Sequence, residues 1–250
     1  MGILSFVIWV MAIIGFGCAV IFCYFVLPWL YGRWQRVSLK LLAVKTKSVV
    51  FTFDDGPSDV TPDVLAVLRQ YNVKATFFLG GARIAGRESI VRQIVAEGHE
   101  IGSHTYSHLH QWYVSPISGI RDIKRGWQAI DNAMEIQNGK YPFRPPYGKL
   151  NLLTLLYLWA KRVPVIFWTT DSRDIAGIVD FDSQRNAMLI KKEGGTVILA
   201  HDYTVKTKDR IIPSLCASIM AAREMGMAVR TISELRAIRR VNNLSDKKNI

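Results

Sequence analysis

The sequence has little cysteine, and this scarcity excludes two classes of structure. Of 250 residues only three are cysteines: Cys18 and Cys23 lie in an apolar stretch, and Cys216 stands alone. A disulfide framework or a cysteine-based zinc site needs several cysteines within one domain. Neither is expected here. The chain also lacks long internal repeats and low-complexity linkers, which favours a single folded domain.

Charged side chains are absent from the N-terminal stretch between Gly2 and Gly32. About 20 apolar residues cross the hydrocarbon core of a bilayer, so this stretch is long enough to span one. Trp29, Tyr31 and Trp34 follow at its end, as in the aromatic belt of a membrane interface. We therefore expect a transmembrane anchor over residues 1–32.

A cleaved signal peptide is the competing interpretation of this stretch. Signal peptides have a basic beginning and small residues at the cleavage site. Residues 1–5 contain neither Lys nor Arg, and residues 27–30 are bulky. The sequence therefore favours an anchor that is retained.

The net charge of +12 lies outside the apolar stretch, with dense basic clusters over residues 33–47 and 236–248. Such clusters are attracted to anionic lipid headgroups. Nucleic acid is not an expected partner, because no zinc-finger or recognition-helix pattern accompanies the charge. We predict a basic juxtamembrane linker over 33–46, a catalytic domain over 47–237 and a polar basic tail over 238–250.

The side of the membrane on which the domain lies stays open. Basic residues follow the span and only the α-amino group precedes it, so the positive-inside rule places the domain in the cytoplasm. A polymeric glycan substrate would be expected outside the cytoplasm. The sequence also leaves the oligomeric state undetermined.

Short apolar runs alternate with helical patterns through the domain. The expected strands cover residues 48–53, 75–79, 100–103, 141–144, 163–168, 195–200 and 227–231. The expected helices cover residues 61–71, 87–97, 118–136, 150–161, 181–192 and 209–225. This alternation predicts an α/β fold with a mostly parallel sheet or a barrel. Seven strand–helix units are one short of a closed eightfold barrel.

Ionisable residues follow several of these expected strands. Val49–Ser58 is an apolar strand that ends in the adjacent carboxylates Asp54 and Asp55 and a Gly-Pro turn. His104 and His108 follow the third strand, and they can face one side if the segment makes a helical turn. One Asp and two His form a ligand set with open positions, which suits a catalytic metal.

Three further strand ends carry polar side chains. Arg144 stands beside a double proline, Asp171 and Asp174 follow the fifth expected strand, and His201-Asp202 follows the sixth. Each could be structural when considered alone. Together they gather at the carboxyl ends of the strands, where α/β enzymes place their active sites.

These motifs, in this order, resemble those of the polysaccharide deacetylases (the NodB-homology domain, carbohydrate esterase family four). The resemblance covers about residues 48–235 and implies a distorted (β/α) barrel of about seven strands and metal-dependent hydrolysis of an N-acetyl group on a sugar. The matching segments are Thr52-Phe53-Asp54-Asp55-Gly56-Pro57-Ser58, His104-Thr105-Tyr106-Ser107-His108, Arg144-Pro145-Pro146-Tyr147, Asp171-x-x-Asp174 and Leu199-Ala200-His201.

The resemblance also implies roles for individual residues. Asp55, His104 and His108 would hold a divalent metal, with Zn²⁺ expected first and Co²⁺ as an alternative. Asp54 would act as the general base and Arg144 would orient it.

The same resemblance assigns the remaining roles around the substrate. The backbone N–H of Tyr147 would stabilise the oxyanion, and His201, oriented by Asp174, would protonate the leaving amine. Pro146, Tyr147 and Leu199 would contact the substrate. One departure is that Ile175 stands where the family has Trp.

Three functions are weighed on this basis. The first is a membrane-anchored hydrolase that removes N-acetyl groups from the N-acetylhexosamine units of an exopolysaccharide or cell-wall polymer. The second keeps the chemistry but takes a lipid-linked sugar at the cytoplasmic membrane face, as a deacetylase or deformylase. The third is an inactive glycan-binding scaffold, which would have lost Asp54, His201 or a metal ligand; all of them are present.

Overall fold

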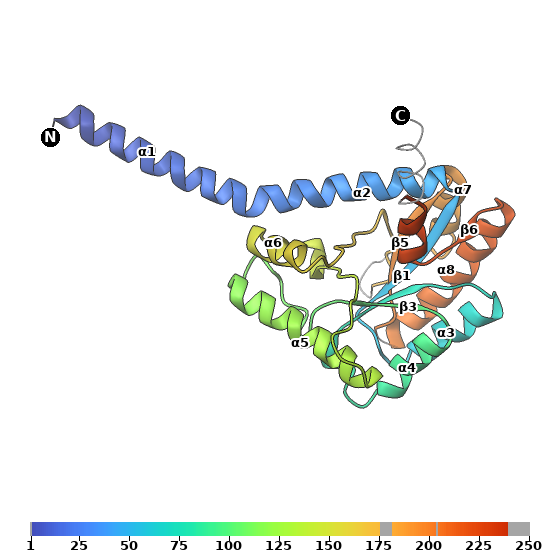
Figure 1. The fold of residues 1–250 in the computed structure, drawn as a ribbon. Helices are drawn as coiled ribbons and strands as arrows, with labels where there is room; N and C mark the ends of the chain where they lie inside the picture. The colour runs from blue at the N-terminus through green and yellow to red at the C-terminus, as the bar shows by residue number, and fades with distance from the viewer. Residues whose placement is uncertain (1, 176–181, 204, 240–250) are drawn as a thin grey trace, which may run out of the picture.

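The computed structural model describes residues 2–175, 182–203 and 205–239. In this part of the chain a parallel sheet is surrounded by helices, and a long N-terminal helix projects away from them (Figure 1). The strands are β1 Ser48–Asp54, β2 Thr76–Leu79, β3 Glu100–Ser103, β4 Thr170–Asp171, β5 Thr196–His201 and β6 Ala228–Val229. The helices of the domain are α3 Thr61–Gln70, α4 Glu88–Ala96, α5 Pro116–Met134, α6 Leu152–Ala160, α7 Arg185–Glu193 and α8 Val205–Glu224, with short 3₁₀ turns η2 Gly81–Arg83 and η3 Pro146–Gly148.

The sheet has the strand order β3-β2-β1-β5-β4, and β6 pairs with the beginning of β1. All the pairs are parallel, so the carboxyl ends of the strands share one edge. The register places Asp54 of β1 opposite His201 of β5. Every residue of β1 is buried, because helices and neighbouring segments cover both of its faces. The expected α/β fold with a parallel sheet is confirmed.

Two of the seven expected strands are reduced to single bridges. Phe143 pairs with Ser103 on one side and with Val165 on the other. Pro142 and Pro164 lie beside these bridges, and proline cannot donate a ladder hydrogen bond. A separate short strand, β4 at 170–171, follows the segment expected as a strand over 163–168. The pairing from β3 towards β4 therefore runs through irregular segments rather than regular strands.

The N-terminal helix continues into the domain. Helix α1 (Ile3–Ile21), the π-helical turn η1 (Phe22–Val26) and helix α2 (Leu27–Lys45) follow one another without a loop. The wider π turn immediately precedes Pro28, whose ring cannot fit a regular helix interior. This continuous helix is long and apolar enough to cross a membrane, and the apolar part is exposed on all sides.

Residues 33–45 are helical and dock on the sheet, where the sequence predicts a linker. Leu39 and Ala43 of α2 are buried in one cluster with Val50 and Val197. Gln35 bonds to the backbone of the strand-like segment at Val165. The predicted boundaries of the domain stay predictions, and most of the predicted tail lies outside the described residues.

Candidate active site

The two adjacent carboxylates at the end of β1 point to different partners. Asp54 is buried, and its Oδ1 accepts a 2.7 Å hydrogen bond from Nη1 of the fully buried Arg144. Asp55 takes a left-handed backbone conformation with φ 69° and is partly exposed. The break in strand geometry therefore turns two consecutive side chains to different partners at one edge of the sheet.

Arg144 is held by its neighbours as well as by Asp54. Nη1 also donates to Thr52 Oγ1 at 2.7 Å, and the guanidinium lies 4.1 Å from the ring centroid of Phe78. Burial raises the pKa of Asp54, although the Arg144 charge and hydrogen bond oppose that effect. Thr52 was not predicted as a site residue. Its position two residues before Asp54 on the same strand, and hence on the same face, is the signal that could have identified it.

Asp55, His104 and His108 form a group with the geometry of a metal site. One ligand atom from each residue lies within 4.8 Å of the others. Asp55 Oδ1 is 3.4 Å from Nε2 of His108 and 3.7 Å from Nε2 of His104. Ligands of a tetrahedral ion at 2.0–2.2 Å would lie about 3.4 Å apart, so the group fits a divalent cation such as zinc.

His104 is oriented for this purpose. Its Nδ1 is 2.8 Å from the backbone carbonyl of Arg144, which leaves Nε2 facing Asp55. A hydrogen bond from one ring nitrogen to a backbone carbonyl fixes the tautomer and the ring orientation of a metal-binding histidine. Burial lowers the pKa of His104 to about 3, so the imidazole is neutral and its lone pair is available.

The segment that carries the two histidines is a loop, and the helical turn considered from the sequence is absent from it. Thr105 and His108 have φ values of 68° and 56°. The His108 N–H donates to Thr105 Oγ1 at 3.0 Å. Left-handed non-glycine residues persist only where the surroundings fix them, and they cluster at functional sites.

His201 and Asp174 form the second buried pair of the site. His201 Nδ1 is 2.9 Å from Asp174 Oδ1, and its backbone N–H donates to Asp174 Oδ2 at 2.6 Å. Burial by itself would lower the pKa of His201, but the hydrogen bond and charge of Asp174, together with the charges of Asp54 and Asp55, outweigh it and raise the pKa to about 9. With this pKa the His201 imidazole carries its second proton at neutral pH.

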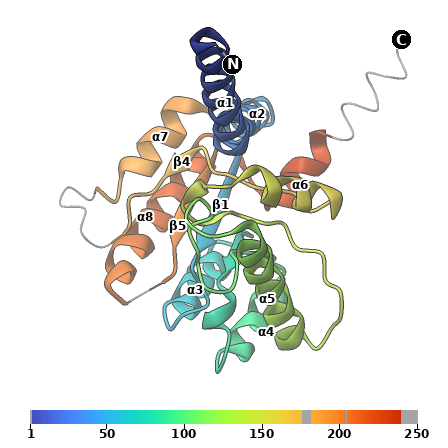
Figure 2. The ribbon, with the colours of Figure 1, turned by 90° about the vertical axis from the view of Figure 1, so that its left-hand side faces the viewer.

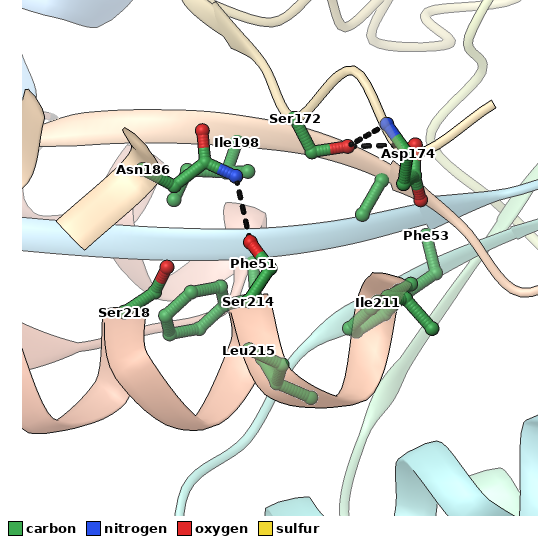
Figure 3. Close-up of a pocket in the computed structure, with 11 residues that line it drawn as sticks. Phe51, Phe53, Ser172, Asp174, Asn186, Ile198, Ile211, Ser214, Leu215 and Ser218 are labelled. Carbon is green, nitrogen blue, oxygen red and sulfur yellow. Dashed lines mark hydrogen bonds between the residues drawn. The ribbon is translucent and has the colours of Figure 1, made fainter. Parts of the chain in front are cut away.

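Asp174 is held by a hydrogen bond from Ser172, as Figure 3 shows. Ser172 Oγ donates to Asp174 Oδ1 at 2.7 Å. A cavity of about 10 Å³, close to the size of one water molecule, lies behind Asp174 between the sheet and α8. Its lining is largely apolar and includes Phe51, Phe53 and Leu215. These surroundings keep bulk solvent away from the far side of the carboxylate.

The predicted substrate-contacting residues lie around these pairs. Tyr147 has φ 56°, is 57% exposed, and its ring centroid is 4.7 Å from that of His108. Pro146 is buried in η3 beside it. Leu199 is buried on β5 and pairs with Thr52 of β1. Ile175 is exposed at the margin of the described chain.

Asp202 is a buried acid that was not predicted as a site residue. Its Oδ2 accepts a 2.5 Å hydrogen bond from Thr61, and its backbone carbonyl accepts one from Ser58. A Cβ atom at Gly56 would lie 2.6 Å from both carboxylate oxygens. Burial raises the pKa of Asp202 to about 7, against the effect of the Thr61 bond. Asp202 thus fixes the turn that follows Asp55.

Comparisons with known proteins agree with this arrangement. The family model described as polysaccharide deacetylase matches residues 42–165. A peptidoglycan-N-acetylglucosamine deacetylase of Bacillus cereus is 33% identical over 200 residues, which cover 76% of this chain and 88% of the relative. The chain belongs to the polysaccharide deacetylase family. Its relatives are named as deacetylases of peptidoglycan N-acetylglucosamine and of chitooligosaccharide, and deacetylases of this kind are hydrolases of amide C–N bonds.

Other relatives are longer, and the chain spans less than half of the length of one of them. The peptidoglycan-N-acetylglucosamine deacetylase of Listeria monocytogenes is 32% identical over 202 residues, which cover 77% of this chain but only 40% of the relative. Among solved structures, the carbohydrate esterase family four domain of a multidomain xylanase from the hindgut metagenome of Trinervitermes trinervoides has a TM-score of 0.67 at 28% identity. That similarity covers 77% of this chain and 90% of the other.

Proposed function

We propose that the protein removes acetyl groups from N-acetylated hexosamine units of a glycan by metal-dependent hydrolysis. The observation that carries the proposal is the meeting of three groups at one edge of the sheet. They are the metal-ligand group of Asp55, His104 and His108, the buried Asp54–Arg144 pair and the His201–Asp174 pair. An amide needs an activated carbonyl, a base for water and an acid for the leaving amine.

Asp55, His104 and His108 would hold the cation. When bound, the cation supplies Lewis-acid chemistry, because it polarises a carbonyl oxygen and makes water more acidic. The neutral imidazole of His104 and the partly exposed Asp55 carboxylate are suited to such a ligand role.

The chain's own groups would carry the protons and the charge. Asp54, with Arg144 fixing one carboxylate oxygen, accepts a proton from the attacking water. The Tyr147 backbone N–H donates to the oxyanion, a contribution of about 3 kcal/mol in comparable sites. His201 then delivers the proton of its imidazolium to the departing amine, and Asp174 holds the ring in position for this transfer.

Acetate release from chitooligosaccharide by the purified full-length protein in detergent tests this proposal. The protein is first treated with a chelator and then given Zn²⁺ or Co²⁺. We expect release to stop on chelation and to return with metal. Absence of release with every metal, in protein that has bound metal, would contradict the deacetylase and favour the scaffold.

We also propose that α1 anchors the protein in a membrane as a single span. The support is its length, its apolar surface on all sides and the aromatic residues before the first charge, Arg33. Reporters fused to the C-terminus, one active only in the cytoplasm and one only outside it, would identify the side on which the domain lies. Extraction of the protein from membranes by carbonate would contradict the anchor.

A further inference from the structure

The N-terminal helix and the active site lie on the same side of the domain. A short turn at Thr46 and Lys47 joins α2 directly to β1, so that the two run in opposite directions, as Figure 1 shows. The beginning of α2 is therefore near the carboxyl end of β1, where Asp54 and Asp55 lie. Figure 2 views the molecule from the side to which α1 projects, and β1 descends from the level of α2 into the domain below it.

A chain of ring contacts connects this helix to the metal-ligand group. Phe25 in the π turn contacts Trp112 at a centroid distance of 5.4 Å. Trp112 is 6.1 Å from His110, which is 5.0 Å from Tyr147. Tyr147 is 4.7 Å from His108. Only three side chains thus separate the apolar helix from a candidate metal ligand.

If α1 spans a bilayer, these contacts determine how far the active site lies from the hydrocarbon core. Residues 3–22 are enough to cross the hydrocarbon core, at about 1.5 Å per residue over about 30 Å. The chain from there to Arg33, the first charged residue, then lies in the headgroup region. Contacts of Phe25 with Trp112 and of Tyr31 with Trp159 bring the domain to that same level.

The surface at this level is apolar. Leu153, Leu156 and Trp159 form one face of α6 and are 50%, 44% and 49% exposed, while the opposite face is buried. Tyr113, next to Trp112, is 83% exposed. We call the five residues Trp112, Tyr113, Leu153, Leu156 and Trp159 the apolar rim.

Cations lie over aromatic rings on the same surface. Lys149 Nζ is 4.4 Å from the ring centroid of Trp112, and the Arg33 guanidinium is 5.2 Å from that of Trp29. Paired aromatic and basic side chains are typical of the membrane interface, where the cations attract anionic headgroups. The charge thus complements the apolar face for an anionic lipid surface.

We propose that the apolar rim docks into the interface of an anionic bilayer, so that the active site takes a glycan held at the membrane by a lipid anchor. This inference rests on the proposed deacetylase function and on α1 as a span. Continuity of the rim with α1 identifies the occupant as lipid. A docked rim confines the site to the surface layer, which raises the encounter rate with substrates anchored there and not with dissolved ones.

A quenching experiment tests the docking independently of catalysis. The full-length protein, with its native cysteines replaced by alanine, receives one cysteine in place of Leu156 or of Met220, which is 51% exposed on α8. Each is labelled with a fluorophore and reconstituted into phosphatidylglycerol–phosphatidylcholine vesicles that contain a headgroup quencher. We expect loss of about half the fluorescence at position 156 and none at 220, since interfacial groups lie about 5–10 Å into the boundary.

A kinetic experiment tests the substrate class. Acetate release is compared for chitotetraose coupled to a dioleoyl lipid in the vesicles and for free chitotetraose. In Leu156→Glu the ratio of kcat/KM for coupled over free substrate should fall about tenfold, equivalent to about 1.4 kcal/mol. The matched control Met220→Glu should keep the wild-type ratio.

The outcomes separate the two proposals. Equal quenching at the two positions, or a ratio unchanged by Leu156→Glu, overturns the docking. A fluorophore at position 156 that is shielded from water but not quenched by the headgroup quencher also overturns the docking, because a protein partner would then cover the rim. Selective quenching without acetate release from either substrate supports the docking and contradicts the deacetylase function.

Discussion

The Arg144 guanidinium and the Asp54 carboxylate form a buried ion pair, with 2.7 Å between Nη1 and Oδ1. Neither side chain is accessible enough to be stabilised by water, so each depends on the other. Desolvation of two charges is compensated only when both are present and hydrogen-bonded. This pair therefore links the stability of the fold to the charge state of the candidate base.

Arg144→Met should lower the free energy of unfolding by about 3–5 kcal/mol, because it removes the guanidinium that is hydrogen-bonded to the buried Asp54 carboxylate. Chemical denaturation of the full-length protein in detergent would measure the loss. Lys208 is a matched control, since it pairs with Asp63 at 2.8 Å where both side chains are over 40% exposed. Lys208→Met should cost only about 0–1 kcal/mol. Equal losses of unfolding free energy in the two variants would show that the buried pair stabilises the fold no more than an exposed pair does.

His108→Ala should weaken metal binding more than about 100-fold. Loss of a residue that only hydrogen-bonds to a metal ligand costs up to about 100-fold, and loss of a ligand itself should cost more. His108 Nε2 is 3.4 Å from Asp55, so one of three candidate ligands is removed. Competition with a chromophoric chelator would measure the affinity. His110 lies on the same loop but outside the ligand group, and His110→Ala should bind metal as the wild type does. Similar affinity in both variants would reject His108 as a ligand.

Asp174→Asn should move the alkaline limit of activity to lower pH. His201 must be protonated to donate to the leaving amine, and its pKa of about 9 depends on the hydrogen bond and charge of Asp174. In the variant burial still lowers the pKa and the charges of Asp54 and Asp55 still raise it, but the larger raising contributions of Asp174 are lost. The alkaline limit should therefore move from about 9 towards the ordinary histidine value of about 6.5. A profile of kcat/KM against pH measures the limit.

The same pKa has a consequence for stability. A raised pKa in the folded state stabilises the fold below the unfolded value near 6.5, and this contribution disappears as pH rises through about 9. Asp171→Asn changes an exposed carboxylate at the end of β4, three residues before Asp174. This control should leave the pH dependence of activity and of stability as in the wild type. An unshifted alkaline limit in Asp174→Asn would refute the role of this pair.

Gly56→Ala should destabilise the protein by about 1–3 kcal/mol, because an added methyl group must displace the packed Asp202 carboxylate. The contact is 2.6 Å to both oxygens, closer than real Cβ atoms approach. Thermal unfolding in detergent would measure the change. Gly15 has no neighbour within 4 Å of an added Cβ, so Gly15→Ala is the control. If Gly56→Ala unfolds at the same midpoint temperature as the wild type, the turn at Asp202 accommodates the methyl group without a loss of stability.

Much of the site could be predicted because it follows from local sequence. Asp54 ends a buried strand, and His201 ends another. Parallel pairing then places the two opposite each other, as the register shows. The positions of strand ends along the chain were therefore enough to bring the candidate base and acid to one edge.

Other features could not be predicted, because they depend on contacts between distant residues. Gln35 of α2 donates a hydrogen bond to the backbone carbonyl of Val165 and accepts one of 2.8 Å from the N–H of Phe167. The segment expected as a linker is therefore a helix that packs on the domain. The packing of Asp202 against Gly56 likewise joins residues far apart in sequence. Prolines beside Phe143 and Val165 reduced expected strands to bridges, an effect that hydrophobic periodicity does not register.

The most direct test of the account is Asp54→Asn in the full-length protein, because the account assigns different functions to two adjacent carboxylates. Bound metal is measured by elemental analysis and acetate release from chitotetraose is measured on the same sample. We predict that the metal content matches the wild type, since Asp55 is the ligand, and that acetate release falls by about 10²–10⁴-fold with loss of the base. Undiminished acetate release, or loss of the metal together with activity, would contradict this division of roles.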